Sequence, residues 1–273
     1  MACASMTNRV WGVAMLDETI DDWGTARLTL NRPQRHNAFN AQLIAALAEA
    51  FTRLGDASEV RAIVLAGAGK SFSAGADLDW MRAAAGWSEA ENQADAMGLS
   101  DMLAAINDCP KPVIVVAHGH VTGGGVGLVA CADIAVAIEG AQFRLSEVRL
   151  GLTPATISPF VLAKMGAAAR RWFLTAEAFG AEDAAAMGLV NEVAIDADAA
   201  EAVVAHWLAH IGEAAPGAVA DAKRLALDFA GAEITDELRE ETARRIAARR
   251  VSAEGREGIN AFLNKGKPGW IAQ

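Results

Sequence analysis

The chain has 273 residues, of which 53% are hydrophobic and 21% are charged, enough apolar material for one large core or a core with a small second domain. Its 24 basic and 34 acidic residues give a formal net charge of -10, which disfavours binding to nucleic acid or to an anionic membrane. Three cysteines, Cys3, Cys109 and Cys131, form neither a disulfide framework nor a paired metal motif. We therefore expect a reducing, cytoplasmic compartment and no metal.

The N-terminal apolar run Val10–Leu16 is followed at once by Asp17 and Glu18, and no basic segment precedes it. It therefore predicts a strand and no signal peptide. The only long uncharged stretch, Pro112–Ala132, has roughly the length of a membrane span but holds five glycines. A buried strand, a turn and a helix account for it better than a transmembrane helix does.

Short runs rich in Val, Ile and Leu recur through the first two thirds of the chain, with helical stretches between them. The predicted strands are Val10–Leu16, Ala26–Leu30, Ala62–Leu65, Val113–Ala117, Ile134–Ile138 and Leu189–Val193. Apolar residues at helical spacing predict an amphipathic helix over residues 40–54, ended by Gly55. This alternation of strands and helices is typical of an α/β fold with crossover helices.

Beyond about residue 197 the pattern becomes almost wholly helical. Predicted helices cover Ala199–Ile211, Ala218–Phe229 and Asp236–Ala248, with Pro216 as a break. We therefore divide the chain into a core domain, residues 1–197, which would hold the active site, and a helical domain, residues 198–273.

Two glycine-bearing segments, Phe72–Leu78 and Gly119–Gly127, each follow a predicted strand. Such a turn into a helix leaves backbone N–H groups without partners and aims them at one spot, a suitable site for an oxyanion. The spacing matches neither a phosphate-binding P-loop nor a dinucleotide fingerprint, and no Gly-x-Ser-x-Gly elbow occurs. A tight turn with a purely structural role stays open as the alternative reading of either glycine cluster.

The paired segments resemble the oxyanion-hole signatures of the crotonase (enoyl-CoA hydratase/isomerase) superfamily, and the similarity runs from residue 30 to residue 189. It implies a spiral ββα core with a C-terminal helical trimerisation domain. The backbone N–H groups of Ala76 and Gly124 would then bind the thioester oxygen. The residues implied to line the coenzyme A (CoA) side of the pocket are Arg35, Ala38, Ala74, Asp77 and Leu78.

Near the C-terminus, residues 260–265 resemble the family segment that reaches the CoA of a neighbouring subunit. This resemblance implies that Phe262 and Lys265 contact the adenine and the 3′-phosphate. It also implies a homotrimer or a dimer of trimers. CoA would enter as part of the acyl-CoA substrate, with no separate cofactor.

The carboxylates depart from the family's hydratase pattern, which has two glutamates. Glu147, in the segment Gln142–Glu147, matches the glutamate that exchanges a proton beside the thioester carbonyl. The other glutamate should stand three residues after Gly124, where this chain has Gly127. Because one carboxylate ordinarily holds the water and one delivers the proton, simple enoyl-CoA hydration is not the expected activity.

Other polar and aromatic residues near these segments have more ordinary interpretations. His118 and His120 flank the second glycine turn and are interpreted as hydrogen-bonded packing residues. Asp133 is expected to cap a turn before a strand. For Trp80, a place in the core and a place in the acyl pocket remain equally open.

The run Ser146–Phe160 and the sequence Gly-Gly-Gly-Val-Gly-Leu are similar to bacterial methylglutaconyl-CoA and isohexenylglutaconyl-CoA hydratases of leucine and terpene catabolism. This resemblance implies a hydro-lyase acting on a branched or glutaconyl-type enoyl-CoA. A Δ3,Δ2-enoyl-CoA isomerase that uses the single Glu147 is the alternative. A non-catalytic or RNA-binding crotonase-like protein is a third possibility, which the net charge disfavours.

Overall fold

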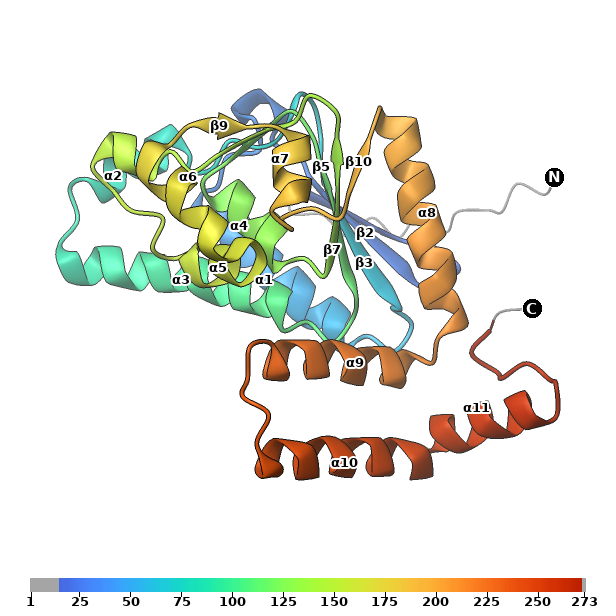
Figure 1. The fold of residues 1–273 in the computed structure, drawn as a ribbon. Coiled ribbons are helices and arrows are strands. Elements are labelled where there is room, and N and C mark those ends of the chain that lie inside the picture. Colours follow the sequence, from blue (N-terminus) through green and yellow to red (C-terminus); the bar gives the residue numbers. More distant parts are fainter. Residues whose placement is uncertain (1–14, 272–273) are drawn as a thin grey trace.

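The computed structural model describes residues 15–271, which form two β-sheets with helices around them (Figure 1). The larger sheet has the order β1-β2-β3-β5-β7-β10 and the smaller one the order β4-β6-β8-β9. The larger sheet contains β1 (Leu16–Ile20), β2 (Thr25–Leu30), β3 (Ala62–Gly67), β5 (Val113–Ala117), β7 (Ile134–Ile138) and β10 (Glu192–Ala194). The smaller contains β4 (Ser71–Ser73), β6 (His120–Thr122), β8 (Gln142–Arg144) and β9 (Ala178–Phe179). Only β1 and β9 pair antiparallel to their neighbours, so the expected α/β fold is confirmed.

Four predicted strands, β2, β3, β5 and β7, lie where the apolar runs placed them, and the other two are shifted. Residues 10–14 of the first run lie outside the described residues, and β1 itself continues through Asp17 and Glu18. Glu18 is buried and pairs with Arg53 of α1 at 2.5 Å, which explains how an acidic residue fits this strand. At the other edge, Leu189 and Val190 are buried in the connection before β10.

Helix α1 (Ala41–Asp56) begins at Asn40, whose side chain accepts a hydrogen bond from the Leu43 amide at 2.9 Å. The expected stop at Gly55 is wrong, because Gly55 lies inside the last turn. A Cβ there would lie 3.1 Å from Pro110 and 3.4 Å from the sulfur of Cys109. Gly55 is therefore explained by close packing against the segment that leads into β5.

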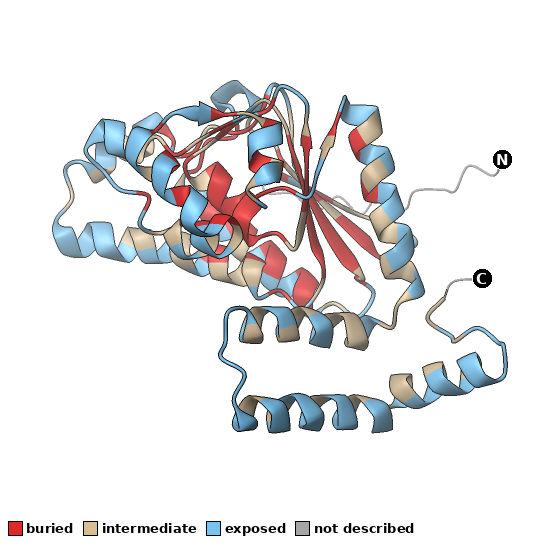
Figure 2. Ribbon diagram, viewed as in Figure 1, coloured by how far each residue is buried: buried red, intermediate tan, exposed pale blue. Residues whose placement is uncertain are grey.

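Helices cover both faces of the larger sheet (Figure 1). One face carries α1, α3 (Glu89–Asn107), α4 (Gly124–Cys131) and α5 (Ser158–Met165), with α7 (Ala181–Ala186) near β10 and with α2 (Leu78–Ala84) and α6 (Ala169–Thr175) farther out. Buried side chains concentrate in the strands and in α4 (Figure 2). The sequence from Pro112 to Ala132 forms β5, β6 and α4, as expected for a buried strand, turn and helix.

Helix α8 (Ala197–Glu213) covers the opposite face, where Ala200 and Val204 pack with Ile114 and Val136. Helix α9 (Pro216–Phe229) lies at the edge of the core, where Lys223 pairs with Asp133 at 2.8 Å (Figure 1). Helices α10 (Asp236–Val251) and α11 (Ala253–Leu263) stand apart from the core and have no buried residue (Figures 1 and 2). The observed break in packing therefore follows α9, and the domain boundary near residue 198 stays a prediction. No helix within residues 15–271 combines the length and the apolarity that crossing a membrane requires.

Candidate active site

The two glycine turns lie side by side because the strands that lead into them, β4 and β6, are parallel neighbours, with Ser71 paired to His120. Gly75 follows β4 with φ +84°, and a Cβ on it would lie 2.8 Å from the carbonyl oxygen of Thr122. Only glycine combines this left-handed backbone with so close an approach. The turn after β4 therefore contacts the turn after β6 directly.

Each turn contains a backbone N–H, that of Ala76 in the first and that of Gly124 in the second, for which residues 15–271 provide no acceptor. Phe39 donates to the carbonyl of Gly75 at 2.6 Å and accepts from the amide of Asp77 at 2.8 Å. In such a parallel bridge the amide of the central residue, Ala76, points away from Phe39. Gly124 is the first residue of α4, so its amide has no intrahelical partner. Among the hydrogen bonds of residues 15–271, none uses either amide as a donor, as an oxyanion site requires.

Phe39 also connects the two turns through its side chain. A Cβ on Gly124 would lie 2.6 Å from Cε2 of the Phe39 ring, which is almost fully buried. The ring therefore packs on the backbone of Gly124, and a larger residue at 124 would have to displace it. Phe39 has no signal in the sequence, because only the folded chain brings this ring to the second turn.

Glu147 lies against the N-terminus of α4. It follows β8 at the start of a short 3-10 helix, Glu147–Leu150. A Cβ built on Gly123 would lie 3.0 Å from Oε1 of Glu147, and the Gly123 amide donates to the carbonyl of Arg144 at 2.9 Å. The Glu147 carboxylate is thus one residue from the free amide of Gly124. The structure brings Ala76, Gly124 and Glu147 together, and their catalytic role stays a prediction.

Burial raises the pKa of the Glu147 carboxyl above its ordinary value. The other carboxyl oxygen, Oε2, is buried and has no hydrogen-bond partner within the described chain. A carboxyl group whose pKa is raised is a stronger base when ionised and stays protonated to a higher pH than a solvated glutamate does. This environment suits a single group that acts first as a base and then as an acid.

The position of the missing glutamate is closed to a side chain. A Cβ on Gly127 would lie 2.6 Å from Cγ2 of Ile157 and 3.4 Å from Leu103, and both of these neighbours are buried. A carboxylate of the substrate therefore cannot take the place of the missing glutamate at this point, since Ile157 fills the space. The wall of the site beside α4 is apolar here.

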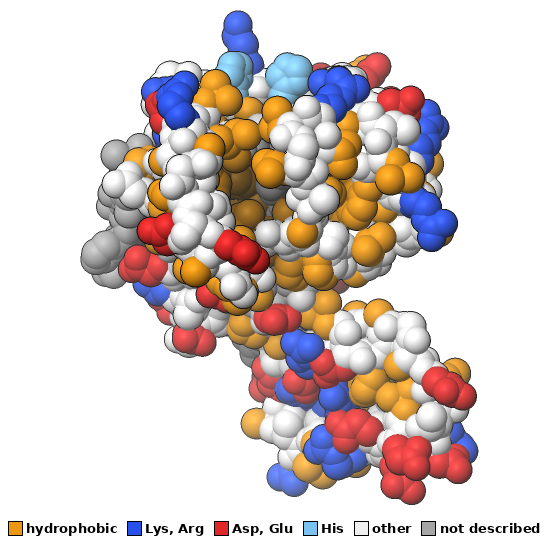
Figure 3. All heavy atoms as spheres, turned by 90° about the vertical axis from the view of Figure 1, so that its left-hand side faces the viewer, with side chains coloured by type: hydrophobic (Ala, Val, Ile, Leu, Met, Phe, Trp, Pro, Cys, Tyr) orange, Lys and Arg blue, Asp and Glu red, His pale blue; other side chains and the backbone are white. Residues whose placement is uncertain are grey.

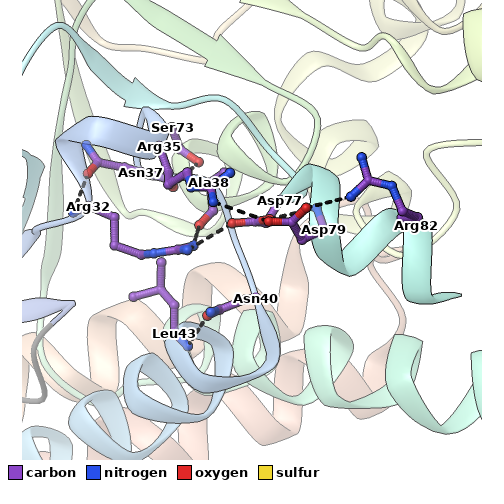
Figure 4. A network of polar contacts seen from close by, with 10 residues as sticks. All are labelled: Arg32, Arg35, Asn37, Ala38, Asn40, Leu43, Ser73, Asp77, Asp79 and Arg82. Atoms are coloured by element: carbon purple, nitrogen blue, oxygen red, sulfur yellow. Dashed lines mark hydrogen bonds and ion pairs between the residues drawn. The ribbon is translucent and has the colours of Figure 1, made fainter.

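A network of polar side chains stabilises the segment next to the turn that follows β4 (Figure 4). The side chain of Arg32 pairs with Asp77 at 2.9 Å, and both are nearly buried. Asp77 also caps α2 by accepting from the amide of Asp79 at 2.9 Å. Burial opposes ionisation of Asp77, but the Asp79 amide and the Arg32 guanidinium outweigh it and lower the pKa of the carboxyl. The buried amide of Asn37 joins the segment to the carbonyls of Ala68 and Ser71.

The residues implied to contact CoA fall into two groups. Arg35, Ala38, Ala74, Asp77 and Leu78 lie around the first turn, where the structure also has a cleft of about 340 Å³. Its lining residues are Arg32, Arg35, Asn40, Ala41, Gln42, Asp77, Asp79 and Trp80. Leu78 is 70% exposed, and Arg35 pairs with Asp79 at 3.2 Å on the surface. The role of these residues toward CoA stays a prediction.

Phe262 and Lys265 form the second group, at the end of α11, in the part of the chain that stands apart from the core (Figure 1). Phe262 is 82% exposed. The fold of one chain does not bring these two residues to the first turn. Their predicted contact with CoA therefore requires a second copy of the chain.

Of the remaining candidates, His118, Trp80 and Asp133 have structural partners, whereas His120 is exposed and makes no side-chain hydrogen bond within residues 15–271. His118 Nε2 lies 3.1 Å from the carbonyl of Gly69, and the indole of Trp80 donates to Asp95 of α3 at 3.1 Å. Asp133 does more than cap a turn, since its carboxylate accepts from the Val113 amide and pairs with Lys223, both within 2.8 Å. Across the described chain no three His, Cys, Asp or Glu side chains are grouped as a metal site requires.

Viewed from the side that carries α2 and α6, the surface is deeply hollowed, and hydrophobic side chains line the hollow (Figure 3). An apolar hollow with a few polar groups is the usual form of a small-molecule site. Free backbone donors, one partly buried carboxylate and apolar walls together suit the stabilisation of an enolate at a carbonyl compound.

Comparison with known proteins identifies the family. The model of the enoyl-CoA hydratase/isomerase family matches residues 22–273. An enoyl-CoA hydratase of Alternaria alternata is 39% identical over 210 residues, 76% of this chain and 68% of the fungal protein. The 1,2-epoxyphenylacetyl-CoA isomerase of Escherichia coli is 30% identical over 263 residues, 90% of this chain and 94% of that enzyme. A crystal structure of an enoyl-CoA hydratase from Shewanella pealeana superposes with a TM-score of 0.90 at 38% identity, covering 94% of this chain and 96% of that one.

The family model spans almost all of the chain, and these relatives include both hydratases and isomerases. The family resemblance in the sequence rests on the two glycine turns and Glu147, and the fold places these segments next to one another. The chain belongs to the enoyl-CoA hydratase/isomerase family and shares its crotonase fold.

Proposed function

We propose that the protein hydrates a branched enoyl-CoA whose acyl chain carries its own carboxylate, of the glutaconyl type. The observation that carries the proposal is the place of Glu147, whose carboxylate lies against the start of α4 beside the free amide of Gly124. A proton donor and acceptor is thereby held next to the point where a thioester oxygen would be bound.

One carboxylate can complete the addition. Ionised Glu147 takes a proton from water while the water oxygen bonds to C3, and the electron pair of the C2–C3 double bond moves through C2 to the thioester oxygen. The amides of Ala76 and Gly124 donate to this oxyanion, a contribution of about 10²–10³ in rate for one such donor. The enolate then takes the proton from Glu147 at C2, which restores the carboxylate. No atom or electron is left over.

Two observations support the glutaconyl type of substrate. The run Ser146–Phe160 resembles methylglutaconyl-CoA and isohexenylglutaconyl-CoA hydratases. In addition, the chain has Gly127, and so no carboxylate, at the position from which the family's other glutamate would hold the water. A carboxylate on the substrate would supply this acceptor, and because Ile157 fills the space at Gly127 it would have to reach the water from another side of the site.

Isomerisation of a 3-enoyl-CoA to a 2-enoyl-CoA is the second candidate, and the single carboxylate favours it. Glu147 would take the proton from C2, the dienolate would rest on the same two amides, and the proton would return at C4. This reaction needs no group that holds water.

Oxygen and deuterium incorporation separates the two reactions. The purified protein is given glutaconyl-type, crotonyl and 3-enoyl thioesters of CoA in deuterated, ¹⁸O-labelled water. The proposal expects ¹⁸O at C3 and deuterium at C2, with the glutaconyl-type ester reacting far faster than crotonyl-CoA. Deuterium at C4 without ¹⁸O would establish isomerisation, and equal hydration rates for the two esters would remove the argument for a substrate carboxylate.

The Glu147→Gln variant tests the group itself, because glutamine keeps the size but cannot exchange the proton. Turnover is expected to fall by about 10²–10⁴ while the affinity for a CoA ester stays similar. Near-normal turnover would assign the chemistry to another residue.

We also propose that the active assembly is a trimer or a dimer of trimers. A protein that sediments as a stable monomer and still binds the CoA ester with full affinity would contradict this proposal.

A further inference from the structure

After α11 the chain returns to the core, and its end lies against the last turn of α8 and the start of β3 (Figure 1). Arg61 donates to the carbonyl of Trp270 and to that of Ala214, both at 2.8 Å. The indole N–H of Trp270 donates to the carbonyl of Glu213 at 3.2 Å. We call these four residues, Arg61, Glu213, Ala214 and Trp270, the C-terminal clasp.

The clasp also holds α11. A Cβ built on Gly258 would lie 2.9 Å from Cη2 of Trp270, so the indole rests on the backbone of that helix. One residue earlier in the tail, the amide of Gly269 donates to Glu257 of α11 at 2.5 Å. Trp270 therefore contacts α11 with its ring while its ring N–H and its carbonyl bond to the core.

Within residues 15–271, α11 has one other route to the core, which runs through α9. Helix α9 is joined to the core by Lys223, whose side chain pairs with Asp133 at 2.8 Å, and the amide of Gly217 in α9 donates to Glu254 of α11 at 3.0 Å. The other contacts among α9, α10 and α11 include partly exposed ion pairs, such as Arg245 with Asp228 at 2.8 Å, and such pairs contribute little to stability. The clasp, which joins three elements around one large aromatic ring, is thus the most direct link between α11 and the core.

We infer that Trp270 is a positioning residue, which sets the place of α11 and, through it, of Phe262 and Lys265. The inference rests on the proposed function in one respect, namely that these two residues contact CoA. Loss of the clasp should therefore weaken the binding of the CoA ester and leave the chemical step at Glu147 intact.

Hydrogen exchange of the intact assembly tests the structural half without any substrate. Trp270→Ala should raise exchange in the amides of α11 roughly tenfold and leave β3 and β5 unchanged, because the helix loses its link to the core. Trp270→Phe keeps the ring on Gly258 and should show a smaller effect. Gly212→Ala, at an open position of α8 close to the clasp, is the control and should show none. Unchanged exchange of α11 in Trp270→Ala would overturn the inference.

Kinetics tests the functional half. Trp270→Ala should raise KM for the acyl-CoA roughly fivefold to tenfold and change kcat by less than about twofold. It should also lose discrimination against a 3′-dephospho-CoA ester, which a merely destabilised core would keep. Faster exchange with an unchanged KM would disprove the connection to the CoA site. If the wild type converts no acyl-CoA ester, the proposed function fails, and the exchange experiment still decides the clasp.

Discussion

Replacing Gly127 by alanine tests whether Ile157 closes the wall of the site. The new Cβ would lie 2.6 Å from Cγ2 of Ile157, whereas carbon atoms pack at about 3.5–4.0 Å, so one of them must move by about 1 Å. Both residues are buried, and overpacking of this kind costs about 1–3 kcal/mol. Alanine gains about 1 kcal/mol over glycine inside a helix. The variant should therefore be less stable than a matched helical Gly→Ala change by about 1–3 kcal/mol.

Gly98 of α3 provides that match, because it is exposed and a Cβ there meets nothing within 4 Å. Urea unfolding of Gly98→Ala should show a gain of about 1 kcal/mol. Ile157→Ala alone should lose about 2–5 kcal/mol. In the double variant Gly127→Ala/Ile157→Ala, the new methyl group at 127 should no longer cost the stability that it loses against Ile157. If the two changes at 127 and 157 add within about 0.5 kcal/mol, the two side chains do not compete for one space and the reasoning is refuted.

Three further variants test the carboxylates and the aromatic ring between the turns. Because the pKa of Glu147 is higher in the folded than in the unfolded protein, this residue lowers the free energy of unfolding as pH rises through the two pKa values. Glu147→Gln should therefore be more stable than wild type at neutral pH. In urea titrations, a difference in unfolding free energy between variant and wild type that does not shrink toward acidic pH would contradict this. Phe39→Ala should lose about 3–5 kcal/mol and most of the turnover, since the ring supports Gly124; full turnover in the folded variant would show that the ring is dispensable. Asp77→Asn leaves the buried guanidinium of Arg32 unpaired, which should cost about 3–5 kcal/mol. In the wild type the ion pair between Asp77 and Arg32 is lost as pH falls through the lowered pKa of Asp77. The difference in unfolding free energy between wild type and Asp77→Asn should therefore disappear in acid, and a difference independent of pH would be evidence against the pair.

The larger sheet follows from the sequence because most residues of its inner strands are buried and therefore appear as apolar runs. β5 and β7 were predicted residue for residue. The smaller sheet could not be predicted, since strands of two or three residues such as β4 and β9 are too short to show a period of two. Gly55 was misplaced for a different reason, because its tight contact with Pro110 exists only after folding.

The candidate site likewise contains residues that the local sequence indicates and residues whose contacts exist only after folding. Glycine-containing turns after strands indicate backbone N–H groups without partners. Ala76 and Gly124 could therefore be identified from the local sequence together with a family resemblance. Phe39 and Ile157 carry no local signal, since each acts through a contact with a residue more than 25 positions away, Gly124 and Gly127 respectively. Apolar side chains of this kind have the appearance of ordinary core until the fold shows what they cover.

Phe39 has a further consequence for how the site responds to thermal motion. Its backbone hydrogen bonds flank Ala76, and its ring lies on Gly124, so one buried residue restrains both donors. Close packing of this kind limits changes in the separation of the two N–H groups. The entropy of arranging the pair is lost once, when the chain folds, and need not be lost again each time a carbonyl enters.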